Sequence, residues 1–286
     1  MKGRVFLPTT LDAALALRVQ YPEALVYCGG TDLLVRLRQM PGARPDLICL
    51  ERVGELLEVS EEAGRIFMGA GVTHARLLDS PLVTQGLPLL AKALDELGSP
   101  PVRNMGTIGG NVATASPAGD CLPPLYCLDA SVLLASQEGR RKMPVKQWIT
   151  GPGKTDLRPG ELIVGVEVIP PPGDEIHHFE KVGQRRALAI SVVSLAARMR
   201  LSSEGGVKAV RLAWGSVGPT VVTCPAAEQA LVGGPLCEEA LKKAAKSVRK
   251  AVRPISDVRA SADYRRQTAG NLLLRLALYR QARGPW

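Results

Sequence analysis

The sequence predicts an α+β protein of two domains, and three observations support this. A strand, a glycine turn, a helix and a second strand follow one another within residues 24–50. Beyond residue 173, three strand-like segments precede three helical ones, an order typical of an α+β domain. Between these regions, Pro170-Pro171-Pro172-Gly173 interrupts both patterns. We therefore expect domains at 1–172 and 173–286, the first divided into subdomains of about 1–55 and 56–172.

The first subdomain begins with a predicted amphipathic helix over residues 11–20, preceded by Thr10 as a plausible N-cap. Residues 24–27 form an apolar run that indicates a short strand leading directly into Gly29-Gly30. A helix over residues 33–38 and a buried strand over residues 46–50 are expected to follow. This order indicates a small α/β unit.

The second subdomain is expected to contain strands over residues 65–69, 131–135 and 161–169. Helical patterns begin at residue 74 and extend over residues 87–97 and 122–127. A second glycine-rich loop runs from Asn104 to Asn111 and is followed by the segment Ala115 to Asp120.

The C-terminal domain is expected to form one antiparallel sheet from strands over residues 178–182, 189–201 and 207–216. Helices are predicted over residues 226–231 and 238–252, and a long final helix over residues 264–283. No internal repeat is present in the sequence.

The chain is basic, with a formal net charge of +9, and much of the excess lies late in the sequence. No aromatic interleaving of the kind used to stack nucleic-acid bases accompanies this excess. A solvated helical face or a protein contact is therefore favoured over nucleic-acid binding. The late basic residues are Lys242, Lys243, Lys246, Arg249, Lys250, Arg253, Arg259, Arg265 and Arg266.

The six cysteines show neither the two-residue spacing of zinc and redox motifs nor the clustering that holds an iron–sulfur centre. The first eight residues are too short and interrupted for a signal peptide, and no apolar stretch is long enough to span a bilayer. We expect a cytoplasmic protein with reduced thiols and no metal site.

Two glycine-rich loops, about 75 residues apart, concentrate the candidate chemistry. Glycine permits positive φ and close approach of a ligand, and successive N–H groups in such turns form anion-binding concavities. If the loops converge, they hold both phosphates of a dinucleotide; the alternative is that both are simply tight turns. Side-chain donors are available at Thr31, Thr107, Asn111 and Ser116. Asp32 and Asp120 have the wrong charge for phosphate, so they suit a ribose hydroxyl, a ring N–H or the loop backbone.

Other apparent motifs are weak. Gly151-Pro152-Gly153-Lys154-Thr155 contains G-K-T, but Trp148 stands where a Walker A loop needs its first glycine. His177 and His178 are adjacent in a predicted strand, so their side chains point to opposite faces and do not chelate one metal easily. No serine or cysteine nucleophile with its histidine partner is recognisable, and no catalytic residue is assigned.

At its glycine loops the sequence resembles the FAD-binding medium subunit of the xanthine dehydrogenase and carbon monoxide dehydrogenase family of molybdenum hydroxylases. The resemblance runs nearly end to end. Four segments carry it: Cys28 to Leu34; Thr107 to Asn111 with Ala115 to Asp120; Phe179-Glu180-Lys181 with Arg185-Arg186; and Asp257 to Arg265. It implies a two-subdomain FAD-binding domain of the PCMH type, which is not a Rossmann fold, followed by a C-terminal α+β domain.

The resemblance also implies which residues bind FAD. Residues Val26 to Leu33 and Thr107 to Asn111 would line the pyrophosphate, Asp120 would lie near the flavin or its ribityl chain, Ile163 would pack by the isoalloxazine and Lys181 would sit beside it. The implied cofactor-binding residues are Val26, Tyr27, Cys28, Gly29, Gly30, Thr31, Asp32, Leu33, Leu97, Thr107, Ile108, Gly109, Gly110, Asn111, Ser116, Asp120, Ile163 and Lys181.

Two departures from the family pattern bear on function. Thr31 stands where some members place histidine, the usual covalent flavin anchor of the wider superfamily, so attachment should be non-covalent. Leu97 stands where fused xanthine oxidoreductases stack an aromatic residue on the flavin, which leaves NAD, a quinone and a ferredoxin open as electron acceptors.

By resemblance, the chain is an oxidoreductase subunit that passes electrons from [2Fe–2S] clusters on a small partner subunit to an external acceptor. A large partner subunit would carry the molybdopterin cofactor, and the assembly would be a dimer of heterotrimers. Two other functions stay open: a self-contained FAD-dependent oxidase, and a basic non-enzymatic adaptor.

Overall fold

The computed structural model describes residues 3–40, 42, 44–185 and 188–280. The chain divides into two compact units, which we describe separately. Unit 1 comprises Met1–Gly86, Gly98–Ala115 and Asp129–Pro170, and unit 2 comprises Leu87–Leu97, Ser116–Leu128 and Pro171–Trp286. Two segments that precede residue 172, Leu87–Leu97 and Ser116–Leu128, therefore pack with the C-terminal part of the chain.

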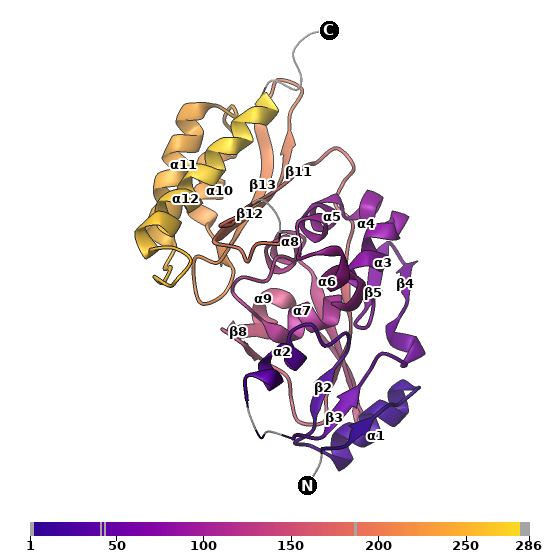
Figure 1. Ribbon diagram of the computed structural model, residues 1–286. Helices are drawn as coiled ribbons and strands as arrows, with labels where there is room; N and C mark the ends of the chain where they lie inside the picture. The colour runs from indigo at the N-terminus through magenta and orange to yellow at the C-terminus, as the bar shows by residue number, and fades with distance from the viewer. Residues whose placement is uncertain (1–2, 41, 43, 186–187, 281–286) are drawn as a thin grey trace. The chain divides into compact units, whose positions relative to one another are not determined.

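Unit 1 contains a three-stranded parallel sheet in the order β1-β3-β2 and a five-stranded antiparallel sheet in the order β4-β5-β10-β6-β7. Figure 1 labels β2 and β3 of the first sheet and β4 and β5 of the second. Its elements are β1 Val5–Phe6, α1 Leu11–Gln20, β2 Leu25–Tyr27, α2 Leu33–Arg38, β3 Leu47–Cys49, η1 Gly54–Leu56, β4 Val59–Glu62, β5 Arg65–Gly69, α3 His74–Asp79, α4 Pro81–Gly86, α6 Pro100–Met105, α7 Ile108–Thr114, β6 Ser131–Ser136, β7 Gly139–Pro144, α9 Val145–Trp148, β8 Ile149–Gly151, β9 Lys154–Thr155 and β10 Leu162–Val168.

The helices and strands predicted for unit 1 are confirmed, although α1 buries only Leu11, Ala14 and Leu15 and is barely amphipathic. The Thr10 hydroxyl caps α1 by accepting a hydrogen bond from the N–H of Ala13 at 3.2 Å. Leu11 and Leu15 are buried in a core that Ile48 of β3 also enters. Strands β2, β3, β5, β6 and β10 all fall within their predicted ranges or at most one residue beyond.

Two edge strands of the five-stranded sheet were not predicted. β4 has the sequence VSEE and β7 the sequence GRRKMP, so neither shows an apolar alternation. Each has one neighbour in the sheet and exposes much of its length, and charged residues are common on such edges because they discourage further strand pairing. The Gly151–Thr155 segment belongs to the small hairpin β8–β9, not to a strand-to-helix phosphate loop.

The second glycine-rich segment is more helical than expected. Ser99 caps α6, which ends at Met105, and Thr107 caps α7, which begins at Ile108. Gly109 and Gly110 therefore lie in the first turn of α7, and neither has positive φ. Glycine is a poor helix former, so the glycines of this segment led to the prediction of a loop rather than a helix.

Unit 2 is built on an antiparallel sheet in the order β11-β12-β13-β14, which confirms the predicted α+β class. Figure 1 shows α10, α11 and α12 along one side of this sheet. Alternate residues of β12, among them Leu195 and Met199, enter the core on that side. The unit contains α5 Pro88–Asp95, α8 Leu122–Cys127, β11 Ile176–Val182, β12 Val193–Leu201, β13 Val207–Gly215, β14 Val222–Thr223, α10 Pro225–Leu231, α11 Glu238–Ala251, α12 Ala262–Leu274 and η2 Arg275–Arg280.

The predicted final helix is interrupted. α12 ends at Leu274 and continues as the 3₁₀ segment η2, and residues 281–283 of the predicted helix lie outside the described residues. His177 and His178 are adjacent in β11, opposite Arg198 and Ala197 of β12, so they face opposite sides of the sheet as expected. Within the part of the chain that the structure describes, no helix is long and apolar enough to cross a membrane.

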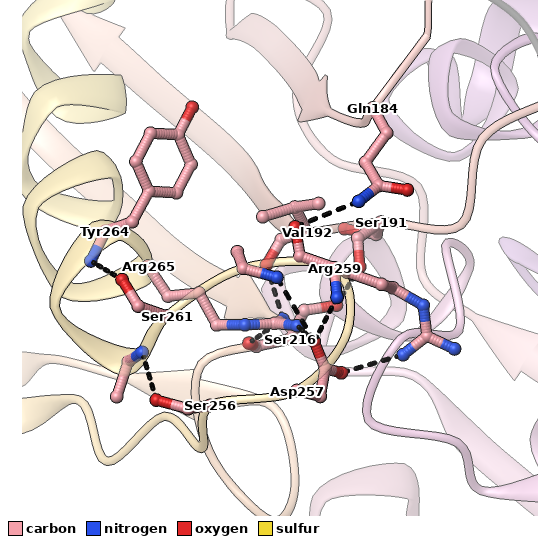
Figure 2. Close-up of polar contacts among 12 residues, drawn as sticks. Gln184, Ser191, Val192, Ser216, Ser256, Asp257, Arg259, Ser261, Tyr264 and Arg265 are labelled. Carbon is pink, nitrogen blue, oxygen red and sulfur yellow. Dashed lines mark hydrogen bonds and ion pairs between the residues drawn. The ribbon is translucent and has the colours of Figure 1, made fainter.

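A buried arginine fixes the loop that leads into α12 (Figure 2). Arg265 donates hydrogen bonds to the Val192 carbonyl at 2.8 Å, the Ser216 carbonyl at 3.1 Å and Asp257 Oδ1 at 2.7 Å. The backbone N–H of Arg259 and then the Arg265 guanidinium lower the pKa of Asp257 to about 2. Asp257 therefore stabilises the fold at every pH above its ordinary range, and this contribution is lost only as the pH falls through about 2.

We expect Asp257→Asn to lower the free energy of unfolding by about 2–4 kcal/mol, because it leaves a buried guanidinium without its counter-charge. Asp263→Asn is the matched control, since Asp263 pairs with Arg266 on the surface of the same helix. Chemical denaturation followed by circular dichroism at neutral pH measures both variants. Equal stability of Asp257→Asn and wild type would contradict the role assigned to this ion pair.

Candidate functional site

The two glycine-rich loops converge within unit 1. A Cβ built on Gly29 would lie 1.7 Å from the Met105 carbonyl oxygen and 3.2 Å from the Gly106 nitrogen. A Cβ built on Gly106 would in turn lie 3.3 Å from Thr31 Oγ1. The two backbones are therefore in direct contact at positions where a side chain does not fit.

The first loop presents unpaired backbone donors. Gly30 has φ +66°, and its N–H donates to the Cys28 carbonyl. Among the described residues, none accepts a hydrogen bond from the N–H groups of Thr31, Asp32 or Leu33. Three successive unpaired N–H groups after a left-handed glycine are an arrangement that binds anions.

Most backbone donors of the second loop are paired within the protein. Its N–H groups donate as follows: Ile108 to the Val72 carbonyl at 3.1 Å, Gly109 to the Ala70 carbonyl at 3.0 Å, Gly110 to Thr107 Oγ1 at 3.1 Å and Asn111 to the Thr107 carbonyl at 3.0 Å. These four bonds fix the start of α7 and leave no free N–H group from Ile108 to Asn111, whereas no described residue accepts a hydrogen bond from the N–H of Thr107.

The second loop offers a bare surface and one polar side chain. Gly110 is exposed, and a Cβ there would meet only Thr107 Oγ1, at 3.1 Å. Gly109 is buried and packs closely on Ala70, from which a Cβ at this position would lie only 2.6 Å. Asn111 Oδ1 is buried and has no hydrogen-bond partner among the described residues. An orphaned buried acceptor is uncommon in a folded protein, and a bound ligand is one way to satisfy it.

Several candidate residues of unit 1 point their side chains into the protein. Val26 and Cys28 pack against the core, and Ile108 is fully buried. Burial raises the pKa of the Cys28 thiol to about 12, so this thiol is protonated and unreactive at neutral pH. Ile163 of β10 is 9% exposed and adjoins a bulge in the pairing of β10 with β6.

Asp32 bonds to α7 and to its own helix. Its Oδ2 accepts a hydrogen bond from the Thr114 hydroxyl at 3.1 Å and lies 3.0 Å from the Arg36 guanidinium, four residues on. Asp32 is the residue before α2, yet its carboxylate makes no hydrogen bond to the N–H groups of that helix. Neither Thr114 nor Arg36 was predicted from the sequence to take part in the site, and 82 positions separate Asp32 from Thr114.

Unit 2 holds a buried ion pair between Asp120 and Lys181. Lys181 Nζ lies 2.8 Å from Asp120 Oδ2, and the two side chains are 4% and 9% exposed. Lys181 also donates to the Glu96 carbonyl, at the end of α5. Asp120 Oδ1 is buried without a partner in the described part of the chain.

Burial raises the pKa of Asp120 to about 6, because loss of water disfavours the carboxylate more than Lys181 favours it. The carboxylate of Glu96 adds to this rise. The folded state therefore binds a proton at Asp120 between about pH 4 and 6. Its contribution to stability is full below the ordinary pKa of 3.8 and is lost as the pH rises through about 6.

The remaining candidates in unit 2 are less distinctive. Leu97 is buried, and Ser116 Oγ accepts a hydrogen bond from the Ala118 N–H at 3.2 Å, so it closes a turn ahead of α8. Of the segment Phe179-Glu180-Lys181 with Arg185-Arg186, Arg186 lies outside the described residues.

Comparison with known proteins gives consistent matches over nearly the whole chain. The profile of the FAD-binding domain in molybdopterin dehydrogenase matches residues 1–172, and that of the CO dehydrogenase flavoprotein C-terminal domain matches residues 178–279. A putative xanthine dehydrogenase FAD-binding subunit from Escherichia coli is 32% identical over 259 residues, which cover 90% of this chain and 88% of that protein.

Solved structures agree. A chain of carbon monoxide dehydrogenase from Hydrogenophaga pseudoflava superposes with a TM-score of 0.91 at 32% identity, covering 98% of each chain. A chain of quinoline 2-oxidoreductase from Pseudomonas putida superposes with a TM-score of 0.92 at 30% identity, covering 98% of this chain and 97% of the other.

The residues present fit FAD. The N–H groups of Thr31, Asp32 and Leu33 supply donors for a pyrophosphate, and Gly110 leaves the adjoining surface of α7 open. Asn111 Oδ1 of unit 1 is a buried acceptor without a partner among the described residues. It suits a hydroxyl donor, which a flavin nucleotide carries.

Two glycine substitutions should separate folding from FAD binding. Gly29→Ala places a methyl group against the Met105 backbone, so we expect both lower stability and loss of FAD. A Cβ on Gly110 meets only Thr107 Oγ1 and valine is a better helix former than glycine, so Gly110→Val should change the thermal stability of the apoprotein little. It should nevertheless abolish FAD retention.

Gly54→Ala is the control, because a Cβ on Gly54 meets no atom within 4 Å. FAD content after gel filtration and thermal melting of the apoprotein provide the two measurements. Full FAD occupancy in Gly110→Val would remove the second loop from the binding site.

The pKa of Asp120 should be measurable by ¹³C NMR titration of aspartate side chains, with its resonance assigned by its absence from Asp120→Asn. We expect a midpoint of about 6 in the wild type. Lys181→Met removes the cation that opposes burial, so the midpoint should rise further. A wild-type midpoint near the ordinary value would show that burial does not outweigh the attraction of Lys181, and a fall in Lys181→Met would show that Lys181 is not the dominant partner of this carboxyl.

Proposed function

Because the chain belongs to the family of FAD-binding subunits of molybdenum hydroxylases, we propose that it is the electron-transfer subunit of such an enzyme. It would connect [2Fe–2S] clusters on a partner subunit with an external acceptor such as NAD or a quinone. The backbone contact between the two glycine loops, with three unpaired N–H groups beside it, is the observation that carries the proposal. This arrangement is better suited to binding a dinucleotide than to catalysis by side chains.

In this proposal the first loop binds the pyrophosphate through the N–H groups of Thr31, Asp32 and Leu33. Val26, Cys28 and Ile108 contribute backbone and packing, since their side chains face the core. Thr31 has no nucleophilic nitrogen, so FAD is held without a covalent bond. Bound FAD supplies the two-electron redox chemistry, and the protein positions it and sets its surroundings.

The Asp120–Lys181 pair is proposed to lie beside the flavin, with Ile163 and Leu97 supplying apolar contacts. Lys181 is not an isolated cation, because Asp120 Oδ2 is 2.8 Å from its ammonium group. A neutralised pair shifts the potential of a nearby flavin less than an isolated lysine does. The pair also changes its protonation near neutral pH, since the pKa of Asp120 is about 6.

We propose two partners, a small [2Fe–2S] subunit and a large molybdopterin-binding subunit, assembled as a dimer of heterotrimers in the cytoplasm. Fewer of the late basic residues are available for docking than the sequence suggests, because some of them make contacts within this chain. Lys242 pairs with Glu238, Arg249 donates to Asn271, and Arg265 is buried. Lys243, Lys246 and Lys250 remain exposed on α11, where they suit an acidic partner.

The names of the similar proteins include xanthine dehydrogenase, carbon monoxide dehydrogenase and quinoline 2-oxidoreductase. Their substrates differ widely although their flavin-binding chains are alike. We therefore place substrate choice in the partner that carries molybdenum. The self-contained oxidase is less favoured, because it requires a substrate site in this chain itself.

Purification of the chain alone and with its two partners tests the proposal. We expect about one FAD per chain, released by acid without covalent attachment. In the full complex the flavin absorbance should bleach on addition of the oxidisable substrate. A complex that lacks the iron–sulfur subunit should not bleach.

Substrate turnover by the isolated chain would instead support a self-contained oxidase. A colourless chain that takes up no FAD and binds DNA in a salt-sensitive manner would support a basic adaptor. Flavin that stays attached after acid precipitation would contradict the non-covalent assignment.

A further inference from the structure

The first glycine loop is weakly anchored for a segment that binds a charged ligand. Helix α2, which follows it, has no buried residue, and Leu34 and Val35 are 41% and 51% exposed. Little apolar burial therefore holds the helix in place. The contacts that locate the loop are the backbone approach at Gly29 and the hydrogen bond from Thr114 to Asp32.

Asp32 is in a position where it would normally oppose anion binding. A carboxylate at the residue before a helix usually accepts hydrogen bonds from N–H groups two or three residues on. Asp32 has a helical backbone conformation and itself carries one of the unpaired N–H groups that follow Gly30, so a carboxylate turned back toward this turn would place a full negative charge beside those donors. Here Asp32 makes no such bond, and its Oδ2 instead accepts the Thr114 hydroxyl at 3.1 Å.

Arg36 does not explain this orientation alone. The Asp32–Arg36 pair is on the surface, with side chains 48% and 61% exposed, and pairs of this kind contribute little. Thr114 is the last residue of α7, whose first turn is fixed by hydrogen bonds to the Val72 and Ala70 carbonyls and to Thr107. Its hydroxyl donates to the Asp32 carboxylate in a hydrogen bond that is also exposed, so two exposed contacts, from Arg36 and from this anchored helix, orient the carboxylate.

We propose that Thr114 is a positioning residue for FAD binding: it holds the Asp32 carboxylate away from the loop N–H groups and so keeps them available to the pyrophosphate. Thr114 need not touch the cofactor to have this effect. The inference rests on the proposed binding of the pyrophosphate by the first loop and adds a residue that lies outside both glycine motifs.

Titration of the apoprotein with FAD, followed by flavin fluorescence, tests the inference. Thr114→Val keeps the shape and removes the donor, so the dissociation constant for FAD should rise about tenfold, which equals about 1.4 kcal/mol. Thr114→Ser keeps the hydroxyl and should bind FAD like the wild type. Thr84→Val is the matched control, because the Thr84 hydroxyl bonds only to the Ser80 carbonyl in α4.

The double variant Thr114→Val with Asp32→Asn gives the decisive result. If the freed carboxylate competes with the phosphates, removing its charge restores FAD affinity toward that of the wild type. If Thr114 serves only as a structural tie, Asp32→Asn alone weakens binding and the double variant shows no recovery. Riboflavin has no phosphate, so its affinity should be the same in Thr114→Val and wild type.

Unchanged FAD affinity in Thr114→Val, no recovery in the double variant, or an equal loss of riboflavin binding would each overturn the inference. A wild-type chain that takes up no FAD would overturn the proposed function as well. Wild-type binding together with an unaffected Thr114→Val would overturn the inference alone.

Discussion

Contact between two stretches of bare backbone is the constraint on which the rest of unit 1 depends. A single methyl group on Gly29 would overlap the Met105 carbonyl, so the strand-turn segment and the helix-turn segment meet without any side chain between them. The segment from Met105 to Thr107 is itself fixed by its neighbours, since the His74 N–H donates to the Gly106 carbonyl and Thr73 forms a β-bridge with Thr107. The two sheets and their helices thus act as a frame that brings two main-chain segments within reach of one ligand.

Most of the elements could be predicted from the sequence because apolar periodicity reports directly on burial. The cap at Thr10, the strands on either side of the first loop and the sheet of unit 2 are all of this kind. The polar edge strand β7 could not be predicted, because its burial is too slight to produce a pattern. The helical state of Gly109 could not be predicted either, since close packing on Ala70 overrides its low helix propensity.

Within the candidate site, the residue types were predictable but their pairings were not. Asp120 and Lys181 were both identified from the sequence. They are 61 positions apart, however, and no sequence pattern shows that they form one buried pair. Asp32 was expected to bond a ribose hydroxyl, a ring N–H or the loop backbone, whereas its observed partner is the Thr114 hydroxyl, which has no distinguishing local signal because threonine in a helix is unremarkable. Direction of a side chain depends on the placement of two distant backbones, and that placement exists only once the fold is complete.

The discontinuity of unit 2 governs the order in which the chain can fold during synthesis. Helices α5 and α8 leave the ribosome early, but the strands they contact, β11, β12 and β13, are complete only when Gly215 has been added. Until then Leu89, Leu90 and Leu125, which are buried in the finished unit, belong to helices whose partner strands are missing. Apolar helices exposed in a nascent chain associate readily with other chains. Synthesis of the segment from α8 to β13 is therefore the stage at which α5 and α8 are most prone to such association.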